Sequence, residues 1–435
     1  MKAQNATPET GNHSSRKPHS PFTGSFFFLG YLWIILGLGT MLVGCAGTGS
    51  AIPESTIDQQ YSFWPQFPAE PRIQFLVAFR SSSDIEPPRS NLEELIYGDE
   101  ADALPIKKPY GVDMANGRIY VCDIQNAGMV VLDLVKKQTR IMGTSGLGGM
   151  IQPTDVDIAD DGMIYVADIR RGVVFVFNAE EKHVASFGKP GLRPVGLTTY
   201  EDELFVCDSA SRSVVVMNRF NGDFIRTIGE AGGEDGQFIL PLGIAVDDQG
   251  LLHVCDVHRC RLQTFERTGE FLTATGFTGD GAGAFVRPKH LDVDEEGVVY
   301  VVDASFQNVQ MFDNEGRVLM FFGSAGEHPG SMDLPAGFCI STDRLDLFQK
   351  YLHPDFEAQS LLVVTNQFNQ NKVSVYARGH LRKGVTVHDI ANSLAPVKTG
   401  VQDAPDTNPA IRPLDDPSPP EQPENKDKSP VTDKG

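Results

Sequence analysis

The chain has 435 residues, 41% of them hydrophobic and 22% charged, so it is long enough to bury a large core in one to three domains. This composition excludes a disordered or collagen-like protein. Lys and Arg number 37 against 57 Asp and Glu, which gives a formal net charge of -20. A grip on polyphosphate backbones needs many Lys and Arg, so the balance argues strongly against nucleic-acid binding.

The first 44 residues have the organisation of a targeting segment. Arg16 and Lys17 precede an apolar run over 26–43, which ends in Leu-Val-Gly before Cys45. This order resembles a bacterial lipoprotein signal peptide, and the resemblance implies lipidation at Cys45 and a body outside the inner membrane. Ala46 stands where retained lipoproteins often carry Asp, which favours the outer membrane. An uncleaved transmembrane anchor is the alternative, because about 18 apolar residues approach the lower limit for a span.

Polar, proline-containing stretches flank the central part of the chain. We assign residues 45–70 to a tether and residues 381–435 to a disordered tail. The stretch 396–435 is rich in proline, has no aromatic residue and carries mixed charge, a composition that does not form a packed core.

An internal repeat fills residues 71–380. Six prolines recur at intervals of 41 to 47 residues, at Pro109, Pro153, Pro194, Pro241, Pro288 and Pro335. Each of the first five is followed by an apolar strand, a turn and a second strand that ends in Asp. These aspartates are Asp123, Asp168, Asp208, Asp256 and Asp303, and the sixth copy has Asn366. A third strand follows in every copy, and in most copies a fourth strand ends in Phe-Gly or Ile-Gly.

Four short strands in about 40 to 48 residues predict one blade of a β-propeller. The segment 241–256 (PLGIAVDDQGLLHVCD) closely resembles the NHL repeat, and the similarity covers about residues 71–380. The resemblance implies an all-β, six-bladed propeller. Residues 72–79 precede the first copy, whereas the sixth ends after its third strand near Tyr376. We therefore expect the N-terminal strand to complete blade six and to close the ring.

The repeated cysteines and aspartates are expected to be structural. Cys122, Cys207 and Cys255 occupy one position in three copies, which predicts small buried core residues rather than a shared metal site. A small-loop disulfide between Cys255 and Cys260 is the alternative. Since a catalytic site needs one constellation rather than five equal copies, we expect the aspartates to accept backbone N–H bonds in the following loops.

The repeat also places charges on two faces. The hairpins between first and second strands carry acidic residues and no basic residue in copies two to five. The opposite face, where each first strand begins at its proline, receives most of the basic residues. We expect this proline face to dock an acidic partner or ligand through Arg171, Arg193, Arg212, Arg259 and Arg287. Ordinary turn chemistry with solvated arginines is the alternative.

One position of the repeat departs from the NHL pattern, which has Gly two residues after the proline. Asp155 stands there in copy two and His290 in copy five, and copies two and five face each other across a six-bladed ring. We expect the pair at the channel mouth, where it would grip a ligand. Gluconolactonase-type and peptidyl-hydroxyglycine lyase propellers perform metal-dependent chemistry at this place. Two ligands alone, however, do not make a closed metal site.

The sixth copy carries an insertion at 343–360. Leu345, Phe348 and Leu352 predict a short amphipathic helix that ends at Pro354 and caps the hairpin face. Together with the sequence around 368–376, the insertion resembles a bacterial subgroup of NHL lipoproteins that often accompany multihaem cytochromes.

These observations favour a lipid-anchored, extracytoplasmic propeller that acts as a binding or scaffold module in the bacterial envelope. The expected partners are envelope proteins, cytochromes among them, or a small molecule, together with the bilayer that holds Cys45. No catalytic residue and no cofactor is predicted. The alternative is a metal-dependent hydrolase or lyase of the gluconolactonase or peptidyl-hydroxyglycine lyase type, which calls for a divalent metal near Asp155 and His290.

Overall fold

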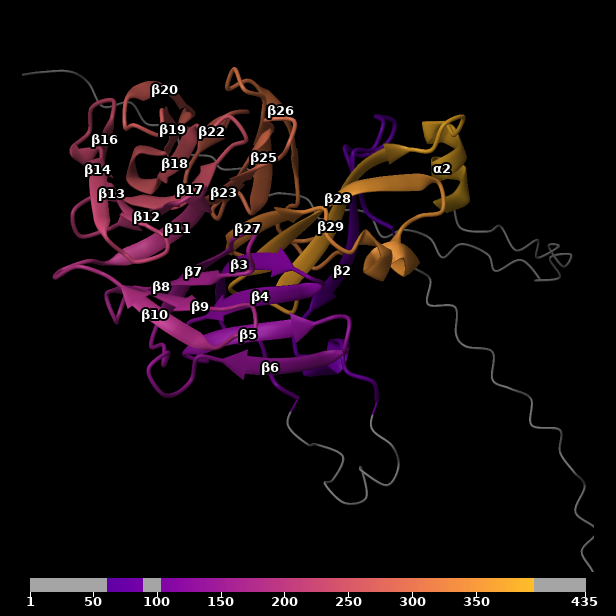
Figure 1. Ribbon diagram of the computed structural model, residues 1–435. Helices are drawn as coiled ribbons and strands as arrows, with labels where there is room; N and C mark the ends of the chain where they lie inside the picture. The colour runs from indigo at the N-terminus through magenta and orange to yellow at the C-terminus, as the bar shows by residue number, and fades with distance from the viewer. Residues whose placement is uncertain (1–60, 89–102, 395–435) are drawn as a thin grey trace, which may run out of the picture. The chain divides into compact units, whose positions relative to one another are not determined.

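The computed structural model describes residues 61–88 and 103–394. The targeting segment, Cys45 and most of the predicted tether and tail lie outside these residues. The described part is almost entirely β-structure, and its main sheets are the blades of a six-bladed β-propeller, as the sequence predicted (Figure 1). Within residues 61–88 and 103–394, no helix has the length and apolar composition needed to cross a membrane.

Blades one to three each consist of four antiparallel strands in chain order. Blade one contains β3 (Pro109–Ala115), β4 (Arg118–Asp123), β5 (Gly128–Asp133) and β6 (Gln138–Met142). Blade two contains β7 (Pro153–Ile158), β8 (Ile164–Asp168), β9 (Val173–Phe177) and β10 (His183–Phe187). Blade three contains β11 (Pro194–Tyr200), β12 (Glu203–Asp208), β13 (Ser213–Asn218) and β14 (Phe224–Ile228).

Blades four and five repeat this order. Blade four contains β17 (Pro241–Val246), β18 (Leu252–Asp256), β19 (Arg261–Phe265) and β20 (Phe271–Thr275). Blade five contains β23 (Pro288–Val293), β24 (Val299–Asp303), β25 (Asn308–Phe312) and β26 (Val318–Phe322). Two small parallel pairs precede them, β15 (Glu230–Ala231) with β16 (Gln237–Phe238) and β21 (Phe277–Thr278) with β22 (Ala284–Phe285). Short 3-10 turns lie at η1 (Ser82–Asp84) and η2 (Val257–Arg259).

Blade six is built from both ends of the folded region. Its strands β27 (Pro335–Ser341), β28 (Phe356–Asn366) and β29 (Val373–Leu381) are completed by β2 (Ile73–Phe79) and then β1 (Phe63–Trp64). In Figure 1 the indigo strand β2 runs beside β29, and the two strands pair antiparallel with Phe75 opposite Tyr376. This confirms that the N-terminal strand closes the ring.

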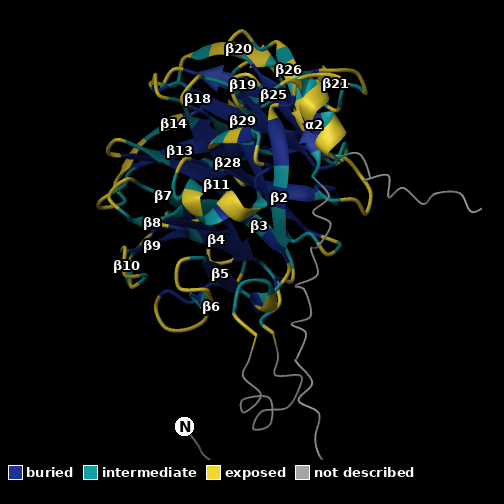
Figure 2. Ribbon diagram, turned by 90° about the vertical axis from the view of Figure 1, so that its right-hand side faces the viewer, coloured by how far each residue is buried: buried dark blue, intermediate teal, exposed yellow. Residues whose placement is uncertain are grey.

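The folded region extends beyond the boundaries that we predicted. Strand β1 falls within the predicted tether, where the buried Trp64 ring packs at 5.8 Å from the ring of Tyr376. Helix α2 (Val387–Leu394) falls within the predicted tail, and its buried Ile390 belongs to the core between blades six and one. Figure 2 shows that the rest of α2 is largely exposed. A few buried apolar side chains therefore attach β1 and α2 to the propeller, although the average composition of both segments is that of a linker.

The burial of each strand follows from its place in the blade. The second and third strands, such as β12 and β13, are buried on both faces because each blade stacks between two others. The outer strand β26 alternates between partly buried and exposed positions, as expected at the rim. Six hydrophobic clusters of described residues lie between neighbouring blades and form the core.

The aspartates that end the second strands fasten the loops on the proline face. Asp168 accepts the backbone N–H groups of Ile151 and Gln152, just before Pro153, and those of Arg170 and Arg171 in the following loop. Asp123 and Asp303 make the equivalent four bonds. The predicted structural role is confirmed, and each aspartate also clamps the loop that enters its own blade.

The described cysteines are all buried and free. Cys122, Cys207 and Cys255 lie within core clusters, as predicted. The alternative disulfide between Cys255 and Cys260 is absent. Instead, the Cys260 thiol faces the backbone carbonyl of Val286 at 3.4 Å.

The insertion of blade six forms the 3-10 helix η3 (Leu345–Tyr351) rather than a regular α-helix. Its Phe348 is buried, as the apolar spacing predicted. Asp343 accepts the N–H of Gly117 at 2.7 Å, and Gly117 belongs to the first hairpin of blade one. The insertion therefore lies on the hairpin face.

Candidate functional site

Asp155 and His290 meet at the axis of the ring. Asp155 lies on β7 and His290 on β23, and His290 Nε2 is 3.1 Å from Asp155 Oδ1. The second carboxylate oxygen, Oδ2, accepts the backbone N–H of Leu197 in blade three at 2.9 Å. The structure thus brings together the two departures from the glycine pattern. Their role in binding a ligand stays a prediction.

Glycine fills the same position in the other blades because the inner strands approach so closely there. A Cβ atom on Gly196 would lie 1.8 Å from the carbonyl oxygen of Leu242. A Cβ atom on Gly111 would lie 2.3 Å from Asp155 Oδ1. This level of the axis therefore has room for two side chains, one from each of two opposite blades.

The charge of Asp155 sets the protonation of His290. Burial by itself lowers the pKa of His290, but the neighbouring carboxylate and its hydrogen bond outweigh burial and raise the pKa above its ordinary value. The remaining nitrogen, Nδ1, is buried and has no hydrogen-bond partner in the part of the chain that the structure describes. It can accept a hydrogen bond when the ring is neutral and donate one when the ring is charged.

A cavity of about 250 Å³ lies on the proline side of this pair. We call it the axial funnel. Its polar lining residues include Gln152, Thr154, Ser209, Lys289 and His290. Its apolar wall comes mainly from blades two to four, with Ile169, Val195, Leu240 and Leu242. A concave site with an apolar wall and a few convergent polar groups is typical of small-molecule binding.

Lys289 lies in the funnel wall and is only 5% exposed. Burial, together with the nearby cations Arg287 and Lys108, lowers the pKa of Lys289 to about 7. Its Nζ atom is 3.4 Å from Gln367 Oε1 and 5.6 Å from the centre of the Tyr110 ring. Lys289 directly follows the blade proline Pro288, but it is not among the five residues predicted from the sequence for the proline face.

Three aspartates lie one step further along the inner strands, four residues after their prolines. Asp113, Asp157 and Asp292 each accept a backbone N–H from the next blade, those of Ile158, Thr199 and Ile340. Burial raises the pKa of Asp157 to about 7 and that of Asp292 to about 6, and it raises the pKa of Asp113 well above its usual range. We call these three the axial carboxylates. Their common register in the repeat was the signal that could have found them.

The axis does not fit the divalent metal that the alternative function calls for. Both oxygens of Asp155 and the Nε2 atom of His290 already have partners within the protein. Among the described residues, no three or more His, Cys, Asp or Glu side chains are grouped so that they could hold a metal ion. The contacts of Asp155 and His290 are those of a hydrogen-bonded pair.

The five arginines that we predicted for the proline face are all exposed. Within the described residues, Arg171, Arg193, Arg212, Arg259 and Arg287 make no ion pair. The hairpin face differs, because arginines from neighbouring blades reach its acidic turns. Arg219 pairs with Asp161 at 2.8 Å, and Arg378 pairs with Asp294 at 2.7 Å. The proline face therefore carries five arginines without an ion pair among the described residues, whereas part of the acidic charge on the hairpin face is neutralised.

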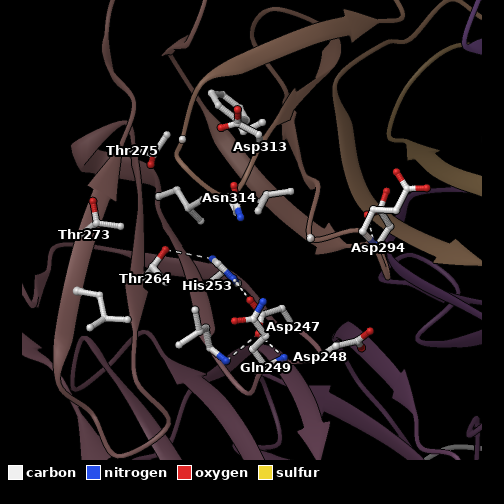
Figure 3. A pocket seen from close by; sticks show the side chains of 18 of the residues that line it. Asp247, Asp248, Gln249, His253, Thr264, Thr273, Thr275, Asp294, Asp313 and Asn314 are labelled. Carbon is white, nitrogen blue, oxygen red and sulfur yellow. Dashed lines mark hydrogen bonds and ion pairs between the residues drawn. The ribbon is translucent and has the colours of Figure 1, made fainter.

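A second cavity, of about 350 Å³, lies between blades four and five (Figure 3). His253 and Thr264 form a cross-strand pair there, at the position where blade five has Tyr300 and Met311. His253 Nε2 faces Asp247 at 3.2 Å and Nδ1 faces Thr264 at 3.1 Å, as the dashed lines in Figure 3 show. The replacement of a large pair by a smaller polar one accounts for the unfilled space.

Several solved structures are similar to this chain in fold. A protein of unknown function from Bacteroides thetaiotaomicron is 13% identical, with a TM-score of 0.50, over 70% of this chain and 75% of that one. A gluconolactonase from Xanthomonas campestris is 14% identical, with a TM-score of 0.46, over 70% and 98%. A virginiamycin B lyase from Staphylococcus aureus is 8% identical, with a TM-score of 0.45, over 62% and 95%. No family model matches the chain.

Proposed function

We propose that this protein is an envelope binding protein whose axial funnel takes a small molecule. The observation that carries the proposal is the funnel itself, a cavity at the ring axis with Lys289 and His290 in its lining. His290 Nδ1 has no hydrogen-bond partner within the described residues. Because a buried polar atom without a partner is costly, a ligand that supplies one would bind there specifically.

We propose that the surrounding face serves the same purpose. The exposed arginines on the loops of the proline face carry positive charge that no described carboxylate neutralises. Such a field attracts acidic molecules toward the funnel and accelerates their association. The same arginines would also suit an acidic surface of an envelope protein, cytochromes among them.

A variant with a blocked funnel tests the small-molecule proposal. Val195 lines the funnel, so Val195→Trp should fill it, whereas Val286→Trp places the same side chain at an exposed position away from the lining. Native mass spectrometry of protein extracted from membranes should show a bound small molecule in the wild type and in V286W but not in V195W. Equal ligand content in V195W and the wild type would contradict the proposal.

We further propose that the protein is an NHL-type lipoprotein anchored through Cys45 outside the inner membrane, with the outer membrane favoured. The order of basic residues, apolar run and cysteine supports the anchor, and the six repeats support the NHL assignment. Cys45→Ser should abolish labelling by an alkyne fatty acid and move the protein from the outer-membrane fraction. Unchanged labelling would exclude Cys45 as the acceptor.

A metal-independent enzyme is a second candidate, and the hydrogen-bonded Asp155–His290 pair favours it. A histidine that is held by a carboxylate and has a free second nitrogen can take up and release a proton. Lactones and esters small enough for the funnel are the first substrates to test. Turnover that is resistant to chelators and lost in His290→Ala would support catalysis, and turnover retained in that variant would contradict it.

A further inference from the structure

Lys289 is a buried lysine that has no carboxylate partner among the described residues. The residue is only 5% exposed, and it forms no ion pair with any described carboxylate. The contact with Gln367 Oε1, at 3.4 Å, is long for a hydrogen bond. Buried lysines are almost always paired, because an uncompensated charge in the interior is strongly unfavourable.

The charged groups around Lys289 do not supply the missing anion. Arg287 and Lys108 are cations, and a further cation, Lys372, donates to the backbone carbonyl of Gln367 at 2.9 Å. Three carboxylates on neighbouring elements have other partners. Asp155 binds His290 and Leu197, Asp123 accepts four backbone N–H groups, and Asp333 acts on Lys372.

Two further polar atoms, on Gln367 and on His290, also lack hydrogen-bond partners among the described residues. Gln367 is 4% exposed, and its Nε2 donor has no acceptor within residues 61–88 and 103–394. His290 Nδ1, next along the chain from Lys289, is a donor when the ring is protonated, and it too has no partner. Lys289 and His290 line the funnel from blade five, and Gln367, which follows β28 of blade six, contacts Lys289. All three nitrogens would be satisfied by oxygen acceptors.

The part of the funnel wall formed by blades three and four is mainly apolar. Val195, Leu240 and Leu242 line it from blades three and four. Its volume of about 250 Å³ is below the range of roughly 300–1,000 Å³ that is typical of drug-sized ligands. A fitting ligand is therefore small, with an anionic head on one side and an apolar body on the other.

We propose that the axial funnel binds the carboxylate of a small organic acid, with Lys289 as the ion-pair partner of the carboxylate and Leu240 and Leu242 against its apolar body. This inference rests on the proposed function, since it names the ligand class of the same funnel. The free lysine is only partly protonated near neutral pH, because its pKa is lowered to about 7. Binding of a carboxylate favours the charged form and is accompanied by proton uptake.

Calorimetry on the full-length protein in detergent tests the proposal. The probes are benzoate, 3-phenylpropanoate and hexanoate, each paired with its neutral primary amide, at pH 7 in two buffers of different ionisation enthalpy. We expect at least one acid to bind about tenfold or more tightly than its amide, with net proton uptake. Lys289→Met should lose that preference and the proton uptake, whereas Lys289→Arg should retain the preference.

The matched control is Lys107→Met, which removes the same charge from an exposed position two residues before Pro109. It should bind the acids as the wild type does. Thermal unfolding checks that Lys289→Met folds, and a melting temperature at or above that of the wild type is expected because a buried charge is removed.

Three results would overturn the inference. Equal affinity for acids and amides, abolished by Val195→Trp, would leave the small-molecule function standing and remove the carboxylate. No binding of any probe at millimolar concentration would count against both. A stable adduct on Lys289 after treatment with an aldehyde and borohydride, without acid binding, would show that the neutral amine forms an imine instead.

Discussion

Asp155 and His290 are 135 residues apart in the chain and belong to opposite blades, yet their side chains share a hydrogen bond of 3.1 Å at the ring axis. The bond exists because glycine at the same position of the other blades lets the inner strands converge. Its contribution depends on pH, because the carboxylate raises the pKa of the imidazole.

Asp155→Asn should therefore lower the pKa of His290, since burial remains and the opposing charge is lost. A group with a raised pKa stabilises the fold fully below its unfolded pKa, about 6.5 for His, and this contribution disappears as pH rises through the folded pKa. The free energy of unfolding of the variant should fall further below that of the wild type at pH 5.5 than at pH 8. Urea unfolding and NMR titration of the histidine measure both effects, and a pH-independent gap would contradict the assignment.

Substitution of an axial carboxylate should have the opposite effect to Asp155→Asn: it should stabilise the protein, and most strongly at high pH. Their pKa values are raised, so their protonated forms stabilise the fold at low pH and the contribution is lost as pH rises toward 7. Asp157→Asn keeps an acceptor for Thr199 and removes the charge. Its melting temperature should exceed that of the wild type at pH 8 and approach it at pH 5. If the melting temperature of Asp157→Asn fell further below that of the wild type at pH 8 than at pH 5, the charge of Asp157 would not be destabilising.

Asp168→Ala should destabilise the protein by about 3 kcal/mol or more, because four backbone N–H groups lose a charged acceptor. Asp160→Ala is the control, since Asp160 is exposed in the hairpin of the same blade, and it should change stability by less than about 0.5 kcal/mol. Urea unfolding compares the two. Similar small effects for both would argue against the clamp.

His253→Tyr should stabilise the protein by about 1 kcal/mol, because it fills part of the cavity between blades four and five. The partner is already in place, since Tyr300 donates to Asp294 at 2.9 Å in the equivalent arrangement of blade five. Thermal unfolding is the measurement. A lower melting temperature would mean that the cavity cannot accept the larger ring.

Metal analysis separates the binding function from the metal-dependent alternative. Protein purified without chelator and an Asp155→Ala, His290→Ala double variant should have the same divalent metal content. We expect this because both oxygens of Asp155 are already hydrogen-bonded. Near-stoichiometric metal in the wild type that is lost in the variant would favour the metal-dependent alternative.

Much of the fold could be predicted because the same pattern of residues occurs six times in the chain. The blade prolines, the clamping aspartates and the apolar second and third strands act over a few residues, and repetition separates their pattern from chance. The same reasoning missed β1 and α2, since two or three anchoring side chains do not change the composition of a segment. It assigned His253 no role. His253 stands where blade five has Tyr300, and the sequence does not show that this difference leaves a cavity between the two blades.

The candidate site could be predicted only in part. The repeat predicted that Asp155 and His290 lie opposite each other. They occupy the same position in copies two and five, and these copies face each other across a six-bladed ring. The sequence alone determined the six-bladed ring, its closure by the N-terminal strand and the face on which basic residues gather, since these follow from local periodicity. Only the tertiary structure decided that the pair is in contact and that, among the described residues, Lys289 has no carboxylate partner and Gln367 Nε2 has no acceptor. These depend on how closely distant strands converge at the axis, and no local pattern encodes that distance.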